Sequence, residues 1–108
     1  MAEREALLEF FDVLSGEWWK YKWNWESEQR LSKWFGILVN TSAHVDALQL
    51  SENGLRGDLN EVSMLQRLVN IRILCLSMNC LVGSIPASIS TLNTLVHLDL
   101  SWNQFTGK

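Results

Sequence analysis

Residues 71–83 read Ile-Arg-Ile-Leu-Cys-Leu-Ser-Met-Asn-Cys-Leu-Val-Gly, and this stretch decides the fold because its pattern occurs three times in the chain. The other copies are residues 45–57 and 95–107. Each copy follows the order apolar-x-x-Leu-x-Leu-Ser-x-Asn-x-(Leu/Phe)-x-Gly, so seven positions match in all three. A match at a nearly fixed period indicates an internal repeat whose units stack on one another.

The chemistry of the pattern predicts what each position does. Leu-x-Leu alternation predicts a short strand whose leucines point inward and whose intervening residue points outward. The asparagines that follow the strands, Asn53, Asn79 and Asn103, are 26 and then 24 residues apart. Because an asparagine amide both donates and accepts, we expect a structural ladder of these side chains that satisfies backbone groups of neighbouring coils. The glycine permits the tight turn that closes each coil.

The three copies resemble leucine-rich repeats, and residues 83–95 are similar to the Gly-x-Ile-Pro-x-x-(Leu/Ile)-x-x-Leu-x-x-Leu signature of the plant-type class. The resemblance implies an α/β solenoid, a right-handed coil with short parallel strands on its concave face and a 3₁₀ or irregular convex side that begins near Pro86. It also implies a short extra strand in each repeat, around Leu55, Leu81 and Phe105. The first repeat has two extra residues and no Ile-Pro between Gly57 and Leu68, which predicts a bulge or a longer irregular turn.

Residues 1–44 differ in composition and are predicted to form an N-terminal cap on residues 45–108, which hold three repeats, the last incomplete and without a C-terminal cap. Apolar residues recur at helical spacing over about residues 3–14, with acidic residues on the other face. This spacing predicts an amphipathic helix that ends at Ser15-Gly16. We expect the tryptophan rings of this part to cover the open end of the first coil: Trp18, Trp19, Trp23, Trp25 and Trp34.

The segment around Trp34 resembles the N-terminal cap of plant-type repeat proteins. Trp34 and Gly36 match that cap, whereas Ser32 and Val39 occupy the positions of its usual disulfide. A cap without the bridge fits either a reducing compartment or a lineage of cap that never used the bridge, and the acidic start lacks the features of a secretory signal. We therefore expect a cytoplasmic location, with an extracellular one left open if the N-terminus is incomplete. Asn40-Thr41-Ser42 is a glycosylation sequon, which we do not expect to be used without a signal peptide.

Charge and composition exclude several classes of function. The formal net charge is −3 and no basic stripe exists, so we expect no nucleic-acid partner. No apolar run approaches the roughly 18–20 residues of a membrane span, so we expect no membrane insertion. Cys75, Cys80, His44 and His97 are too few for a zinc site, and they lack the positioned base and oxyanion site that a cysteine nucleophile needs. We expect a non-catalytic protein without metal or cofactor.

The outward positions of the repeats are the candidate partner-binding residues. An exposed methionine–tryptophan pair, Met78 and Trp102, is a common interface anchor, and the alternative is that a following repeat or an oligomer contact partly covers Trp102. We expect a protein or peptide ligand to bind the concave face by rigid-surface recognition, and the resemblance implies a role in signalling or defence. Aligning the copies gives the rows Asp46, Arg72, Val96; Ala47, Ile73, His97; Gln49, Cys75, Asp99; and Glu52, Met78, Trp102, of which all but Ala47 and Cys75 are predicted to contact the partner.

Two other interpretations of the chain stay open. It could be the N-terminal capping fragment of a longer leucine-rich-repeat receptor or scaffold, with no binding activity of its own, because it stops as the third repeat closes. Repeat arrays normally need a polar cap at each end, so self-association through the uncapped C-terminal end is a further expectation. A weaker alternative is carbohydrate binding by the aromatic cluster of residues 18–25.

Overall fold

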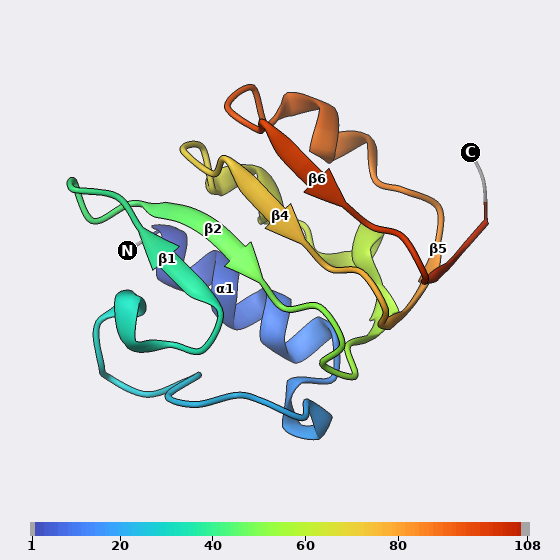
Figure 1. Ribbon diagram of the computed structural model, residues 1–108, viewed down its shortest axis with the longest axis horizontal. Helices are drawn as coiled ribbons and strands as arrows, with labels where there is room; N and C mark the ends of the chain where they lie inside the picture. The colour runs from blue at the N-terminus through green and yellow to red at the C-terminus, as the bar shows by residue number, and fades with distance from the viewer. Residues whose placement is uncertain (1, 107–108) are drawn as a thin grey trace.

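The computed structural model describes residues 2–106 and shows short strands layered against one helix (Figure 1). The helix α1 spans Ala2–Val13, against the expected residues 3–14. The strands are β1 (Ile37–Val39), β2 (Val45–Gln49), β3 (Arg56–Asp58), β4 (Ile73–Cys75), β5 (Cys80–Gly83), β6 (His97–Asp99) and β7 (Gln104–Phe105). Short 3₁₀ helices connect them: η1 (Gly16–Trp18), η2 (Leu31–Lys33), η3 (Leu59–Glu61), η4 (Leu65–Arg67) and η5 (Ala87–Thr91). Within the described range, no helix has the length and apolar character needed to cross a membrane.

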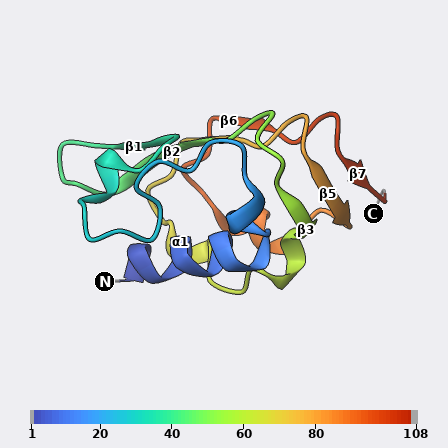
Figure 2. The ribbon, with the colours of Figure 1, turned by 90° about the horizontal axis from the view of Figure 1, so that it is seen from below.

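The repeat produces two parallel sheets. In the first, β2, β4 and β6 lie side by side with Leu48, Leu74 and Leu98 in register. In the second, the extra strands β3, β5 and β7 pair in the same order, as expected. Figure 2 shows the first sheet on one side of the molecule and α1 on the other, with β3, β5 and β7 following one another beside them. Each repeat therefore forms one coil of a solenoid, and this prediction is confirmed.

Strand β1 was not expected from the sequence. It pairs antiparallel with β2, with Ile37 opposite Leu48, and it covers the edge of β2 that no earlier repeat occupies. The backbone N–H of Gln49 also donates to the carbonyl of Gly36 at 2.7 Å. A sheet edge without a partner exposes a row of backbone donors and acceptors, so β1 closes the N-terminal end of the first sheet.

The convex side differs between the repeats. In the second repeat η5 directly follows Pro86, as the resemblance implies. In the first repeat, of the predicted bulge or longer irregular turn, the irregular turn is wrong, because residues 58–68 contain the two short helices η3 and η4. The carboxylate of Asp58 caps η3 by accepting the backbone N–H of Asn60 at 2.9 Å. The extra residues of this repeat thus lengthen the helical path rather than leaving it irregular.

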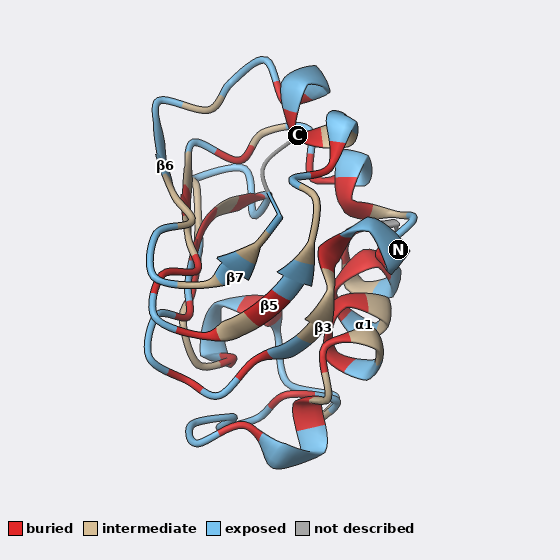
Figure 3. Cartoon of the chain, turned by 90° about the vertical axis from the view of Figure 1, so that its right-hand side faces the viewer, coloured by how far each residue is buried: buried red, intermediate tan, exposed pale blue. Residues whose placement is uncertain are grey.

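Glu9 of α1 ties the cap to the first repeat. Its carboxylate accepts the Ser63 hydroxyl at 2.7 Å and the Met64 backbone N–H at 2.8 Å, between η3 and η4. Burial raises the pKa of the Glu9 carboxyl, but these hydrogen bonds outweigh it, so the pKa lies below its ordinary value. Figure 3 shows α1 turning buried residues toward the strands and exposed residues outward.

Three tryptophans form the core of the cap. Trp19, Trp25 and Trp34 are at most 6% exposed. The ring centroids of Trp19 and Trp25 are 4.9 Å apart, and those of Trp25 and Trp34 are 5.0 Å apart. Each indole N–H donates to a backbone carbonyl, of Leu14, Phe35 and Gln29 respectively. A buried indole needs a hydrogen-bond acceptor for its N–H group. In this cluster the rings are buried and every indole N–H has such an acceptor.

The expectation that all five cap tryptophans cover the first coil is wrong for two of them. Trp18 is 77% exposed and Trp23 is 71% exposed, because the segment that carries them runs over the surface between buried rings. The turn at Ser15-Gly16 after α1 also differs from what its glycine would suggest. Ser15, not a glycine, takes the left-handed backbone (φ 62°), whereas a side chain on Gly16 would lie 2.3 Å from the ring of Phe11.

Candidate partner-binding face

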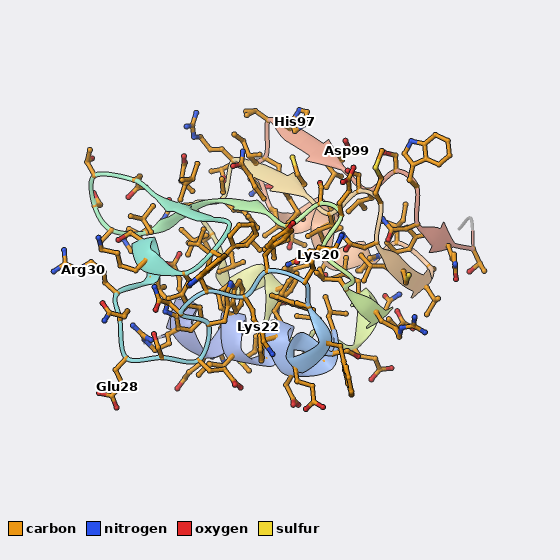
Figure 4. The ribbon with its side chains drawn as sticks, turned by 60° about the horizontal axis from the view of Figure 1, so that its bottom comes forward. Lys20, Lys22, Glu28, Arg30, His97 and Asp99 are labelled. Carbon is orange, nitrogen blue, oxygen red and sulfur yellow. The ribbon has the colours of Figure 1, made fainter. Side chains whose placement is uncertain are left out.

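The strand register brings the predicted binding residues to one surface. Ile73 of β4 pairs with His97 of β6, and Cys75 pairs with Asp99, as the alignment of the repeats predicted. Figure 4 shows His97 and Asp99 beside each other on β6. All ten predicted partner-binding residues are partly or fully exposed. We call their surface the strand face: Asp46, Gln49, Glu52, Arg72, Ile73, Met78, Val96, His97, Asp99 and Trp102.

Ala47 does not belong to the strand face, although the alignment placed it in an outward row. It is fully buried and pairs with Leu38 of β1. In the sheet Ala47 lies between Leu38 of β1 and Ile73 of β4, so its small side chain is flanked on both sides. In the aligned row of Ala47, Ile73 and His97, solvent therefore first reaches a side chain at Ile73, which is half-buried.

Arg72 and Asp46 of the strand face form an ion pair. The Arg72 guanidinium donates through Nε to one Asp46 carboxylate oxygen at 2.7 Å and through its terminal nitrogen to the other at 3.0 Å. The Arg72 guanidinium lowers the pKa of the Asp46 carboxyl, and the carboxylate raises the pKa of Arg72 in return. Such a two-point pair fixes both side chains. The arginine of the strand face thus has its charge matched by a neighbour in the preceding coil.

Asp99 and Cys75 form a second pair of neighbours across strands. Hydrogen bonds from the Ser101 hydroxyl at 2.6 Å and the Ser101 backbone N–H at 3.1 Å lower the pKa of Asp99, as does the nearby His97. Burial raises the pKa of the Cys75 thiol, and the Asp99 carboxylate raises it further. Because the thiolate is the nucleophilic form, this environment lowers the reactivity of Cys75.

The row Glu52, Met78 and Trp102 lies where the chain leaves the first sheet. All three residues have a left-handed backbone, with φ between 54° and 58°. The N–H of Glu52 donates to the carbonyl of Ser77, and that of Met78 to the carbonyl of Ser101, which keeps the row in step from coil to coil. Met78 is 47% exposed and Trp102 is 76% exposed. The sequence identified these residues as outward but gave no sign of the shared turn, because none of them is a glycine.

The asparagine ladder holds this row in place. Asn79 is buried and bonds both to its own coil and to the coil before it. Asn103 accepts the N–H of Leu81 at 3.0 Å and donates back to the carbonyl of Leu76 at 2.8 Å. No repeat precedes Asn53, and its side chain instead accepts the backbone N–H of Tyr21 and donates to the carbonyl of Tyr21. The cap therefore supplies a substitute for the missing coil.

The opposite end of the first sheet is open in the described residues. The N–H groups of Leu50 and Leu76 donate to the next coil, but the equivalent N–H of Leu100 has no acceptor within residues 2–106. Leu98 is 44% exposed, whereas its equivalents Leu48 and Leu74 are fully buried. A surface hollow of about 500 Å³ lies along this edge, lined by Ile85, Leu98, Asp99, Leu100, Ser101, Trp102, Asn103 and Phe105.

The part of the chain that the structure describes holds no group of three residues with metal-ligating side chains. Its two cysteines, Cys75 and Cys80, are free thiols.

Comparison with known proteins agrees with the repeat. Residues 70–92 and 94–108 match the Leucine Rich Repeat family model. A probable inactive receptor kinase of Arabidopsis thaliana is 34% identical over 108 residues, which cover 98% of this chain and 16% of the relative. The crystal structure of PEPR1–AtPEP1 has a TM-score of 0.77 at 27% identity, over 94% of this chain and 14% of that one.

A further solved structure is the Arabidopsis receptor kinase HAESA in complex with the peptide hormone IDA and the co-receptor SERK1. It has a TM-score of 0.70 at 27% identity, over 96% of this chain and 17% of that chain. The chain thus spans less than a fifth of the length of each of these relatives. The stacked repeats, their asparagine ladder and these matches make the chain a member of the plant-type leucine-rich repeat proteins.

Proposed function

We propose that the chain is a non-catalytic recognition module that binds a protein or peptide segment through the strand face. The observation that carries the proposal is the ordered row of Glu52, Met78 and Trp102, whose side chains are exposed although their backbones are fixed by hydrogen bonds between coils. A surface that is ordered before binding loses little conformational entropy when a partner docks. Signalling or defence is the general role that this proposal fits.

The charge of the strand face indicates which kind of peptide it would bind. Arg72 is paired with Asp46, whereas Glu52 is exposed and Asp99 adds a second carboxylate, which lines one surface hollow together with Trp102. The accessible end of the strand face therefore combines negative charge with apolar anchors. A peptide segment that carries a basic side chain next to an apolar one complements this surface. The peptide hormone bound by HAESA makes a peptide ligand a reasonable class for a repeat protein of this kind.

A matched pair of variants tests the proposal. Trp102 on the strand face and Trp18 on the cap are exposed to the same extent, 76% and 77%. Randomised peptides are displayed and selected on the chain, and the Kd of each enriched peptide is measured. We expect Trp102→Ala to weaken binding by about 10-fold or more, as loss of an aromatic anchor does, and Trp18→Ala to leave it unchanged. Equal affinity for wild type and Trp102→Ala would overturn the proposal.

In a second candidate function, the chain is the N-terminal capping fragment of a longer repeat array and binds no partner itself. Residues 1–44 are then the cap, and the repeats of residues 45–108 stack on it. The unpaired N–H of Leu100 and the exposure of Leu98 within the described residues favour it, since a further coil would satisfy both. In this case the peptide selection enriches nothing, and the chain associates with itself through the open edge. Sedimentation should then show that Leu98→Lys abolishes the association, whereas Val96→Lys, at the position just before the same strand, does not.

Carbohydrate binding by the cap is a weaker candidate, favoured by the exposure of Trp18, Tyr21 and Trp23. Sugar rings stack on exposed aromatic faces, so binding should change the fluorescence of these residues. Titration of the chain with a glycan panel, repeated on a Trp18→Ala/Trp23→Ala double variant, separates this activity from the strand face. A fluorescence change that persists in the double variant would count against the cap as the sugar site.

A further inference from the structure

The tip of the hairpin between β1 and β2 holds Asn40 in a defined turn. The backbone N–H of Asn40 donates to the carbonyl of His44, and the N–H of Ala43 donates to the carbonyl of Asn40, both at 2.9 Å. The side-chain oxygen of Asn40 accepts the N–H of Ser42 at 2.9 Å and that of His44 at 3.1 Å. Because two backbone donors bind this atom, it is the oxygen of the amide, and the orientation of the group is fixed.

The nitrogen of the same amide is left without a protein partner. Within residues 2–106, Nδ2 of Asn40 donates to no acceptor, whereas Nδ2 of Asn24 donates to the carbonyl of Lys33 at 2.8 Å. Asn40 also lines two surface hollows, one of them shared with Arg4 and Arg30 and the other with Asp46 and Arg72. A group attached to Nδ2 therefore replaces no hydrogen bond of the fold and has space beside it.

Asn40, Thr41 and Ser42 form the Asn-x-Ser/Thr tripeptide that N-glycosylation requires, and no other asparagine in the sequence is followed by Ser or Thr two positions later. Thr41 and Ser42 are both exposed. We propose that Asn40 is the acceptor of an N-linked glycan when the chain passes through a secretory lumen. The proposal does not rest on the recognition function proposed above.

The covalent step uses a lipid-diphosphate-linked oligosaccharide as co-reactant. Nδ2 of Asn40 forms a bond to the anomeric carbon of the first sugar. The bond between that carbon and the diphosphate oxygen breaks, the lipid diphosphate leaves with the electron pair, and one amide proton passes to solvent. Nδ2 keeps its second proton, and the side-chain oxygen keeps its bonds to Ser42 and His44.

The position of the glycan has a consequence for the strand face. Asn40 shares its hollow with Asp46, Arg72 and Val96, which lie where β2, β4 and β6 begin. The row of Glu52, Met78 and Trp102 follows the other ends of these strands. The glycan therefore covers the Asp46 end of the face and leaves the anchor row accessible.

The experiment expresses the whole chain behind a cleavable secretory leader in eukaryotic cells, with a second sequon in an appended tail as an internal control. Intact mass before and after glycosidase treatment counts the glycans on the secreted protein. We expect two on wild type and on Ser42→Thr, and one, on the tail, on Asn40→Gln and Ser42→Ala. If Ser42→Thr carries only the tail glycan, Asn40 is not an acceptor.

A second measurement tests the structural part of the proposal. Urea unfolding of the secreted wild type is compared before and after enzymatic removal of the glycans. We expect the same midpoint, because Nδ2 has no bond to lose. A clearly lower midpoint for the glycosylated form would show that the glycan disturbs the hairpin, which contradicts the geometry.

Discussion

The side-chain oxygen of Asn79 accepts the backbone N–H of Asn53, one coil earlier in the chain, at 2.9 Å. The same oxygen accepts the N–H of Leu55 at 3.0 Å, so one atom satisfies two backbone donors of the preceding coil. Its amide nitrogen donates to the carbonyls of Leu50, Leu76 and Ser77. No strand ladder reaches these groups, because they lie in the turn between β2 and β3 or between β4 and β5. Asn79 therefore joins two coils at a point that backbone pairing leaves open.

Replacement of Asn79 by alanine should lower the free energy of unfolding by about 3 kcal/mol or more, because each buried group left unsatisfied costs roughly 1–3 kcal/mol. Asn103→Ala is the matched control. Asn103 lies on the last coil, is only partly buried and accepts a single backbone donor, of Leu81. Urea denaturation should therefore give a smaller loss for Asn103→Ala. An equal loss at both positions would show that the ladder does not act through buried groups.

Tryptophan substitutions should separate the core of the cap from its surface. Trp34 is 1% exposed and lies beneath the guanidinium of Arg4, 5.2 Å from the ring centroid. We expect Trp34→Ala to cost about 3–5 kcal/mol, as for other buried aromatic residues. Trp18→Ala should stay within about 0.5 kcal/mol of wild type, because its ring is exposed. Thermal unfolding followed by circular dichroism measures both, and a large loss for Trp18→Ala would contradict the surface assignment.

The repeated part of the fold could be predicted because its information is periodic. The spacing of the leucines fixes which residues face inward, and the aligned copies fix the register of β2, β4 and β6. The alignment of the three repeats therefore already predicts that Ile73 lies beside His97 and that Cys75 lies beside Asp99. The outward position of Met78 and Trp102 follows from the same alignment.

The cap and the fine structure of the turns could not be predicted in the same way, because they depend on contacts that occur once. Three residues at Ile37–Val39 are too short for a pattern, yet they form β1, which flanks Ala47 in the sheet. Trp18 and Trp19 are adjacent in sequence and opposite in burial. The left-handed turn of Trp102 also has no local signal, since stacking between coils and not a glycine imposes it.

Two glycines near the cap should differ in their tolerance of a side chain. Gly57 has φ 139°, and a Cβ there would lie 2.8 Å from the backbone oxygen of Val13. Gly54 has φ 78°, but its nearest foreign atom would be 3.6 Å away. Gly54→Ala should cost about 1–2 kcal/mol from the left-handed backbone alone. Gly57→Ala should cost more, because a backbone atom of the cap must also move, and urea denaturation should show this order.

The pair of Asp46 and Arg72 should make stability depend on pH in a defined direction. The pKa of Asp46 is lowered in the folded chain by the Arg72 guanidinium. Its contribution to stability is therefore complete above the ordinary pKa of an aspartate and is lost as the pH falls through the lower folded-state value. Because the pair is at the surface, the effect should also shrink as salt is added.

A titration of the side-chain carboxyl carbons by NMR measures this coupling directly. In Arg72→Gln the pKa of Asp46 should rise toward its ordinary value, because the donor that stabilises the carboxylate has lost its charge. Asp99 serves as the control in the same spectra, since Ser101 and His97, not Arg72, lower its pKa. Asp99 should titrate as in wild type. An unchanged Asp46 titration in Arg72→Gln would mean that the two-point contact between β2 and β4 does not hold the two side chains together in solution.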